Sequence, residues 1–176
     1  MVTGGLTDPV TIPLAADERT TLTAFLAHYR RQFLDRCRRV GDDDLRRPLT
    51  GSGLTLARLL THLAYVERVW FTVRLDGAQL PPPFAGLDWR RDVDAEMTVS
   101  DGWAGEDLIA LLEQTIEDSD RRLRASGSLD RPTEGVDGNG DHWSLRWILV
   151  HLIEEYARHC GHADLLREAV DGDLAD

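Results

Sequence analysis

The residues SLRWILVHLIEEYARHCGHADLLREAV, at positions 144–170, have the spacing of one long amphipathic helix. Its apolar side consists of Ile148, Leu152, Tyr156, Ala163 and Leu166. At about 100° per residue, four polar side chains fall in one narrow sector of the same helix: His151, Glu155, His159 and His162. Burying polar atoms is unfavourable unless they are hydrogen-bonded or bound to a metal. The stretch therefore predicts a core helix that carries a polar site.

Three further stretches have helical spacing, at about residues 17–40, 55–75 and 106–125. Residues 77–105, which separate the second and third stretches, are too long for a simple bundle connection. No alternating strand pattern is apparent, although a short extended piece within that connection is compatible with the sequence. The expected fold is an all-α four-helix bundle, formed by residues 1–176 as a single domain.

The ends of these helices have recognisable signals. Asp17 or Thr20 can cap the first helix, and Ser144 can cap the last. Asp76–Gly77 is expected to end the second. Residues 1–16 are expected to form a tail on the surface.

Composition excludes several classes of protein. The chain has 176 residues, 42% of them apolar, and a net charge of −11 from 20 basic and 31 acidic residues. Nucleic acids and anionic membranes bind basic surfaces, so both are poor partners. No apolar run is long enough to span a bilayer and no secretion signal is apparent. Cys37 and Cys160 make no disulfide framework, which favours the cytoplasm.

The residues that best fit a functional site are three potential metal ligands on two helices. Glu155 and His159 lie one helical turn apart and can reach the same ion. His62 is the histidine in the middle of the second helix, on its apolar side. Two histidines and one glutamate would leave a coordination position open for water or substrate, as in catalytic sites.

Other kinds of site fit the sequence less well. The HExxH motif of zinc proteases, the paired ExxH motifs of di-iron bundles and the lysine of a phosphate-binding loop are absent. A nucleophilic pair of Cys160 with His159 is conceivable. Neighbouring residues on a helix, however, point about 100° apart and do not face each other.

Two segments resemble the DinB superfamily of metal-binding four-helix bundles: LARLLTHLAYVERVWF (56–71) and WSLRWILVHLIEEYARHCGHADLLREAVDG (143–172). They are most similar to an actinobacterial branch with the signature HLIEE-YARH-x-GH, except that Cys160 stands where Asn is expected. In the similar mycothiol-dependent maleylpyruvate isomerase type, one histidine, one glutamate and a second histidine hold the metal. The resemblance implies that His62, Glu155 and His159 hold a divalent metal, with Zn²⁺ the expected ion.

The resemblance further implies an S-transferase or isomerase that uses a low-molecular-weight thiol, with mycothiol the expected cosubstrate, and a homodimer. The metal would lower the pKa of the thiol, and the thiolate would attack a small electrophile. Residues 77–105, anchored by Trp89 and Trp103, and the acidic loop before the last helix would shape the pocket. The alternative is a non-catalytic bundle that binds metal or associates with itself.

Each of these residues also has a simpler interpretation. His62 could be a hydrogen-bonded core histidine, and Glu155 could pair with Arg158. His151 is expected below the metal, in the core or supporting the site, and His162 at the pocket mouth or across a dimer. Glu67 could either support a ligand or form a surface ion pair.

The remaining histidines, cysteines and tryptophans are assigned simpler roles: His142 in an exposed loop, His28 on a helix face, Cys37 as structural, and Trp143 and Trp147 in packing.

Overall fold

The computed structural model describes residues 10–49 and 51–172. In chain order, its elements are α1 (Glu18–Arg38), α2 (Asp42–Leu45), α3 (Leu56–Glu67), the π-helix η1 (Arg68–Leu75), the 3-10 helix η2 (Met97–Ser100), α4 (Gly105–Ala125), β1 (Pro132–Val136), β2 (His142–Ser144) and α5 (Leu145–Asp171). Most of the expected N-terminal tail, residues 1–9, and the acidic residues 173–176 lie outside the described residues.

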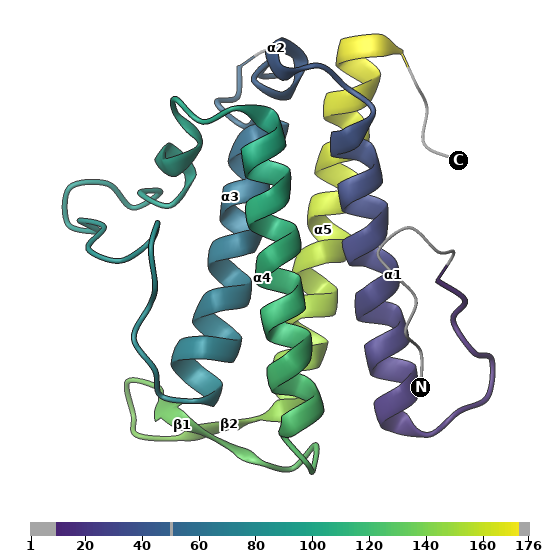
Figure 1. Cartoon of the computed structure of the whole chain (residues 1–176), viewed down its shortest axis with the longest axis vertical. Coiled ribbons are helices and arrows are strands. Elements are labelled where there is room, and N and C mark those ends of the chain that lie inside the picture. Colours follow the sequence, from purple (N-terminus) through teal and green to yellow (C-terminus); the bar gives the residue numbers. More distant parts are fainter. Residues whose placement is uncertain (1–9, 50, 173–176) are drawn as a thin grey trace.

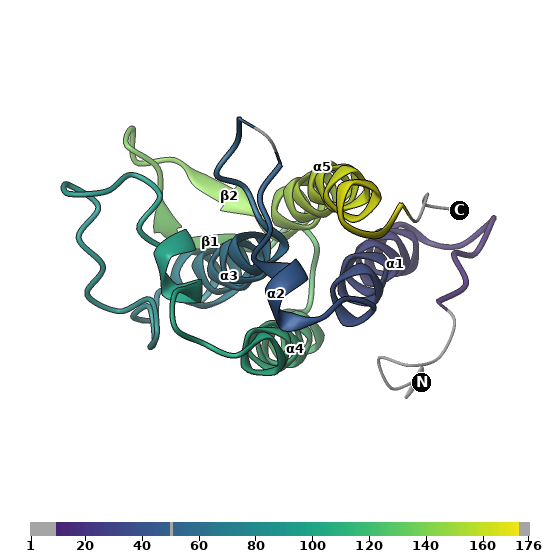
Figure 2. The same cartoon turned by 90° about the horizontal axis from the view of Figure 1, so that it is seen from above.

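Four long helices form the bundle that the sequence predicted (Figure 1). Seen from above, α5 lies beside both α1 and α3, and α4 packs on α3 (Figure 2). The helices share one core of mostly leucine side chains, together with the fully buried rings of Phe33, Phe71 and Tyr156. The all-α, DinB-like prediction is confirmed. Within the described part of the chain, no helix combines the length and apolar character needed to cross a membrane.

The helix ends follow the capping signals. Asp17 accepts a hydrogen bond from the backbone N–H of Thr20, and Ser144 accepts one from that of Trp147. Each satisfies an N–H group that the first turn of a helix leaves unpaired. Gly172 ends α5 with a φ of 71°, a left-handed conformation that glycine adopts without strain. The bonds confirm Asp17 and Ser144 as caps.

The helix expected over residues 55–75 changes its winding midway. It is α-helical to Glu67 and continues as the π-helix η1 to Leu75. Apolar periodicity cannot distinguish the two, because one wider turn shifts the stripe by only one position. Downstream of Gly41, the expected acidic turn is the short helix α2.

A hairpin stands where only a polar loop was expected. Strands β1 and β2 pair antiparallel, and Gly135 packs directly on the backbone of Arg74 in η1 (Figure 1). The strands have 5 and 3 residues and contain proline and glycine, so they give no alternating pattern to detect. The extended piece considered for residues 77–105 is not found; that connection contains turns and η2.

The long connection is held against α3 by aromatic contacts. The ring of Tyr65 packs against Phe84 and Trp89, with centroids 5.5 and 5.0 Å away. Phe84 is fully buried, so it anchors the connection more firmly than Trp89, whose side chain is exposed. Trp103 is held mainly by its backbone carbonyl, which accepts a bond from Arg46. These contacts fix the segment that carries Glu96 beside α3.

A buried cluster of charges joins all four long helices. The guanidinium of Arg30 donates two bonds of 2.7 Å to Glu67 and one of 2.8 Å to Asp120. Tyr156 donates its hydroxyl to Glu67 at 3.0 Å. Glu67 is fully buried, so the predicted surface ion pair was wrong. Its hydrogen bonds go to Arg30 and Tyr156 and not to a candidate metal ligand. Its partner lies 37 residues away, where no local pattern could indicate it.

Candidate metal centre

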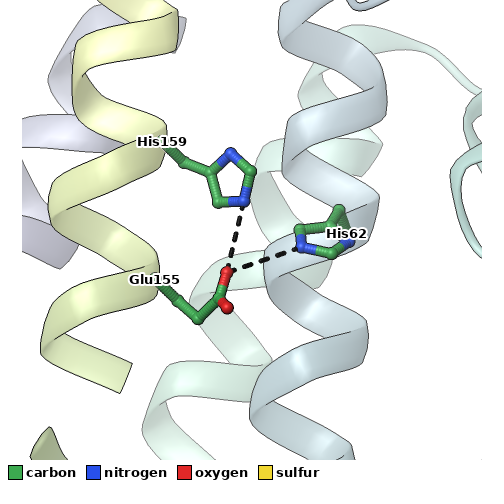
Figure 3. Close-up of side chains that lie close together, drawn as sticks. All are labelled: His62, Glu155 and His159. Atoms are coloured by element: carbon green, nitrogen blue, oxygen red, sulfur yellow. Dashed lines mark ion pairs between the residues drawn. The ribbon is translucent and has the colours of Figure 1, made fainter. Parts of the chain in front are cut away.

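Helices α3 and α5 bring His62, Glu155 and His159 together (Figure 3). Each residue offers one ligand atom, and these atoms all lie within 4.8 Å of one another. Oε2 of Glu155 is 3.4 Å from Nε2 of His159 and 3.9 Å from Nε2 of His62. His159 is buried, whereas His62 and Glu155 are partly exposed. The constellation therefore has an inner side in the core and an outer side that solvent reaches.

The spacing of these atoms suits a metal ion better than a set of hydrogen bonds. Charge-assisted hydrogen bonds to a carboxylate are about 2.7–2.9 Å long. Metal–ligand bonds of about 2.0–2.1 Å in a tetrahedral arrangement would separate neighbouring ligand atoms by about 3.3–3.4 Å. The 3.4 Å separation between Glu155 and His159 matches this value, and the 3.9 Å separation to His62 is slightly wider. Two imidazoles and a carboxylate thus fit a site in which three residues hold a divalent metal ion.

Glu155 is not simply the partner of Arg158. Arg158 donates to Glu154 at 2.5 Å, whereas its nearest approach to Glu155 is 3.6 Å. His151 also approaches Glu155, at 3.9 Å. The carboxylate of Glu155 is 14% exposed and is surrounded by nitrogen atoms at distances of 3.4–3.9 Å. The simpler alternative for Glu155, an ordinary ion pair with Arg158, is therefore the weaker interpretation.

Burial keeps His159 in the neutral form that a ligand needs. Burial, followed by the neighbouring His62, His162 and Arg158, lowers the pKa of His159 to about 3. At neutral pH the ring is uncharged, so one of its nitrogens has a free electron pair. Coordination requires this form, because a protonated imidazole cannot bind a metal.

His162 lies next to His159 and bonds to it. The Nδ1 atoms of the two rings are 3.2 Å apart, so one of them donates to the other. If Nδ1 of His159 is the donor, its Nε2, which faces Glu155, carries the electron pair. This contact lies within the chain, and the expected position of His162 at a pocket mouth or across a dimer stays a prediction.

Glu96 belongs to this site and was not predicted. Its Oε1 lies 2.9 Å from Nδ1 of His62, on the side of the ring opposite to Nε2. It immediately precedes η2 in the long connection, a segment without helical or strand periodicity. The only signal in the sequence was the unusual length of the connection, which does not single out one of its acidic residues.

Aromatic rings extend from the site along α5. His151 stacks on Trp147, with centroids 5.0 Å apart, and both contact Trp70. Trp143 packs against Trp70, and the guanidinium of Arg74 lies over its ring. Trp147 remains 43% exposed, so it is only partly the packing residue that was expected. His151 supports the region below Glu155, in agreement with its predicted place.

The cysteines do not provide a reactive thiol. Cys37 and Cys160 are free and buried. Burial raises the pKa of Cys160 to about 11 and that of Cys37 further still. The Cys160 thiol donates to the backbone carbonyl of Tyr29. Both therefore stay protonated at neutral pH, which argues against a Cys160–His159 nucleophile.

Comparison with known families shows which family the chain belongs to. A family model described as mycothiol-S-transferase matches residues 21–172. This range includes the bundle helices, apart from the first three residues of α1, and all the residues of the candidate site. No curated protein matches the chain. This family is DinB-like, in agreement with the bundle and with the resemblance seen in the sequence. The chain belongs to the mycothiol S-transferase family.

Proposed function

We propose that this protein is a metal-dependent S-transferase that joins mycothiol to a small electrophile, with the ion held by His62, Glu155 and His159. The observation that carries the proposal is the arrangement of the three ligand atoms, within 4.8 Å of one another, in a chain of this family. Zn²⁺ is the expected ion, because imidazole and carboxylate ligands in a three-residue set are typical of catalytic zinc.

A bound divalent ion would supply the positive charge that lowers the pKa of the thiol to near neutrality. The chain itself supplies two imidazoles and a carboxylate. His159 is kept uncharged by burial. The partly exposed side of Glu155 and His62 leaves room for the thiol to approach. The thiol proton would leave to solvent, and the sulfur would form a bond to an electrophilic carbon. The bond from that carbon to the leaving group would break at the same time, and the leaving group would depart with the bonding electron pair.

Consumption of mycothiol tests this function. Purified protein with one equivalent of Zn²⁺ is mixed with mycothiol and a model electrophile, and the loss of free thiol is followed. We expect turnover that falls to the background rate after chelation and in His159→Ala. His28→Ala is the matched control, because it removes a partly exposed imidazole from α1, a helix that carries none of the three proposed ligands. Turnover that survives in His159→Ala would overturn the proposal.

The same assay decides between this function and the non-catalytic bundle. If the wild-type protein binds Zn²⁺ but does not consume mycothiol with any electrophile tested, metal binding alone remains as its activity. Conversely, a wild-type protein that contains no metal and is active with a chelator present would overturn the metal-dependent mechanism.

We further propose that the protein is a homodimer. We also propose that it works in the cytoplasm, where cysteines such as its two free ones stay reduced. Sedimentation over a wide concentration range tests the dimer. A single species with the mass of two chains is expected, and a monomer at every concentration would overturn this part of the proposal.

A further inference from the structure

The bond between Glu96 and His62 has a consequence for the proposed metal site. We infer that Glu96 is a positioning residue, which holds the ring of His62 so that Nε2 points toward Glu155 and the ion. The inference rests on the proposed function, since it concerns the same site. Glu96 itself lies behind the ring and takes no part in binding the ion.

The geometry of the ring supports this role. Nδ1 lies 2.9 Å from Glu96, and Nε2 lies 3.9 Å from Glu155. An ionised carboxylate only accepts hydrogen bonds, so Nδ1 must carry the proton and Nε2 the free electron pair. Turning the ring over would break the bond to Glu96 and direct a carbon atom toward it. One contact thus selects both the tautomer and the orientation that binding needs.

The carboxylate of Glu96 is itself held firmly. Its side chain is 7% exposed, at the start of η2. The backbone around it is fixed by turn bonds from Met97 to Asp94 and from Val99 to Glu96. Arg46 reaches in from the end of α2 and donates to the carbonyl of Ser100 at 3.0 Å. The long connection therefore places the carboxylate of Glu96 beside Nδ1 of His62.

The charge of Glu96 is hard to explain by packing alone. Its second oxygen, Oε2, is buried and has no hydrogen-bond partner among the described residues. Burying a carboxylate with one oxygen unsatisfied destabilises the folded state. A contact that only attached the connection to α3 would be better made by a neutral or apolar side chain. A negative charge behind a ligand imidazole, in contrast, makes the imidazole a better electron donor.

The test measures metal affinity and does not depend on turnover. Zn²⁺ affinity is determined by competition with a chromophoric chelator for the wild type, Glu96→Gln and Glu96→Ala. Glu96→Gln keeps the shape and an acceptor oxygen but removes the charge. Loss of such a partner typically weakens binding by roughly 10- to 100-fold. We expect a loss in this range for Glu96→Ala and a smaller one for Glu96→Gln. Glu106→Gln, an exposed carboxylate at the start of α4, should leave affinity unchanged.

Two further readouts separate positioning from a purely structural role. The melting temperature of metal-free Glu96→Gln should match that of the wild type, and its Co²⁺ absorption spectrum should differ from the wild-type spectrum. In metal-free wild-type protein, ¹⁵N spectra of histidine should show His62 protonated at Nδ1.

The outcomes distinguish the two proposals. Zn²⁺ bound by wild type and Glu96→Ala with equal affinity, or His62 protonated at Nε2, would overturn the positioning role and leave the proposed function intact. A wild-type protein without affinity for Zn²⁺ would overturn both.

Discussion

Two clusters of charged side chains lie a few residues apart on α3 and α5, and they differ in how the protein satisfies them. In the buried cluster, Arg30, Glu67, Asp120 and Tyr156 make hydrogen bonds of 2.7–3.0 Å. In the candidate metal centre, nitrogen atoms surround Glu155 at 3.4–3.9 Å, too far for strong hydrogen bonds. The first cluster is complete within the chain, whereas the second has its ligand atoms at a spacing that suits coordination of a cation.

This difference in spacing is what we expect between a cluster that holds the fold together and a cluster that binds an ion. A buried ion pair whose hydrogen bonds are all made holds helices in one arrangement, although it need not add net stability. A group of ligand atoms at metal spacing gains its stabilisation only when an ion is bound. Glu67 and Glu155 are the same residue type on facing helices, and they differ in the partners that surround them.

The largest effect is expected from breaking the buried cluster. Glu67→Ala leaves the Arg30 guanidinium in the core without its main partner, which should lower the free energy of unfolding by about 3–5 kcal/mol. Urea unfolding of metal-free protein measures this change. Glu113→Ala, which removes a surface partner of Arg38, should change it by less than about 1 kcal/mol. Similar effects for the two variants would mean that the Arg30–Glu67 pair does not hold the bundle together.

Removing the ion should have the next largest effect. With free Zn²⁺ at 100 times its dissociation constant, binding stabilises the folded state by about 2.7 kcal/mol. A chelator should therefore lower the melting temperature of the wild type and leave that of His159→Ala unchanged. Equal shifts in the two proteins would show that the stabilising ion binds elsewhere.

Lowering the pH should decrease the stability of the metal-free protein, because His159 binds a proton more readily in the unfolded state than in the folded state. Its pKa is about 3 in the folded state, against about 6.5 for an unfolded chain, so the unfolded state binds the proton more readily between these values. Stability is therefore retained above about pH 6.5 and falls as the pH decreases from there toward 3. Urea unfolding at pH 7.5 and pH 5, with chelator present, should show a smaller loss for His159→Gln than for the wild type. Equal losses would contradict the low pKa of His159.

The smallest effect concerns Cys160, the neighbour of His159. Because its pKa is about 11, the folded protein should react with a thiol reagent at pH 8 at least about 100-fold more slowly than the protein in urea. Absorbance of the released reagent measures the rate. A fast reaction of one thiol per folded chain would return Cys160 to consideration as the nucleophile and weaken the case for the metal centre.

Periodicity predicts some of these features and not others. Helix geometry was enough to place Glu155 beside His159, because it relates residues three and four apart. It does not relate two different helices, so His62 was added from its apolar position on the second helix and from the family resemblance. The helix at residues 106–125 and the caps Asp17 and Ser144 were predictable for the same local reason.

Features that depend on distant contacts were not predictable. Glu96 reaches His62 from a connection without periodicity, and Glu67 meets Arg30 across the core. The hairpin is stabilised by packing on η1 and not by the propensity of its own short strands. In each case a tertiary contact outweighs the local pattern.

Titration of metal-free protein with Zn²⁺ tests the central claim most directly, with binding followed by calorimetry for the wild type, Glu155→Ala and Glu67→Gln. The two variants each alter one glutamate of the two compared clusters. We predict one ion per chain for the wild type and for Glu67→Gln, if the latter remains folded by circular dichroism, and loss of tight binding in Glu155→Ala. Undiminished binding of one ion by Glu155→Ala would contradict the assignment of the metal centre.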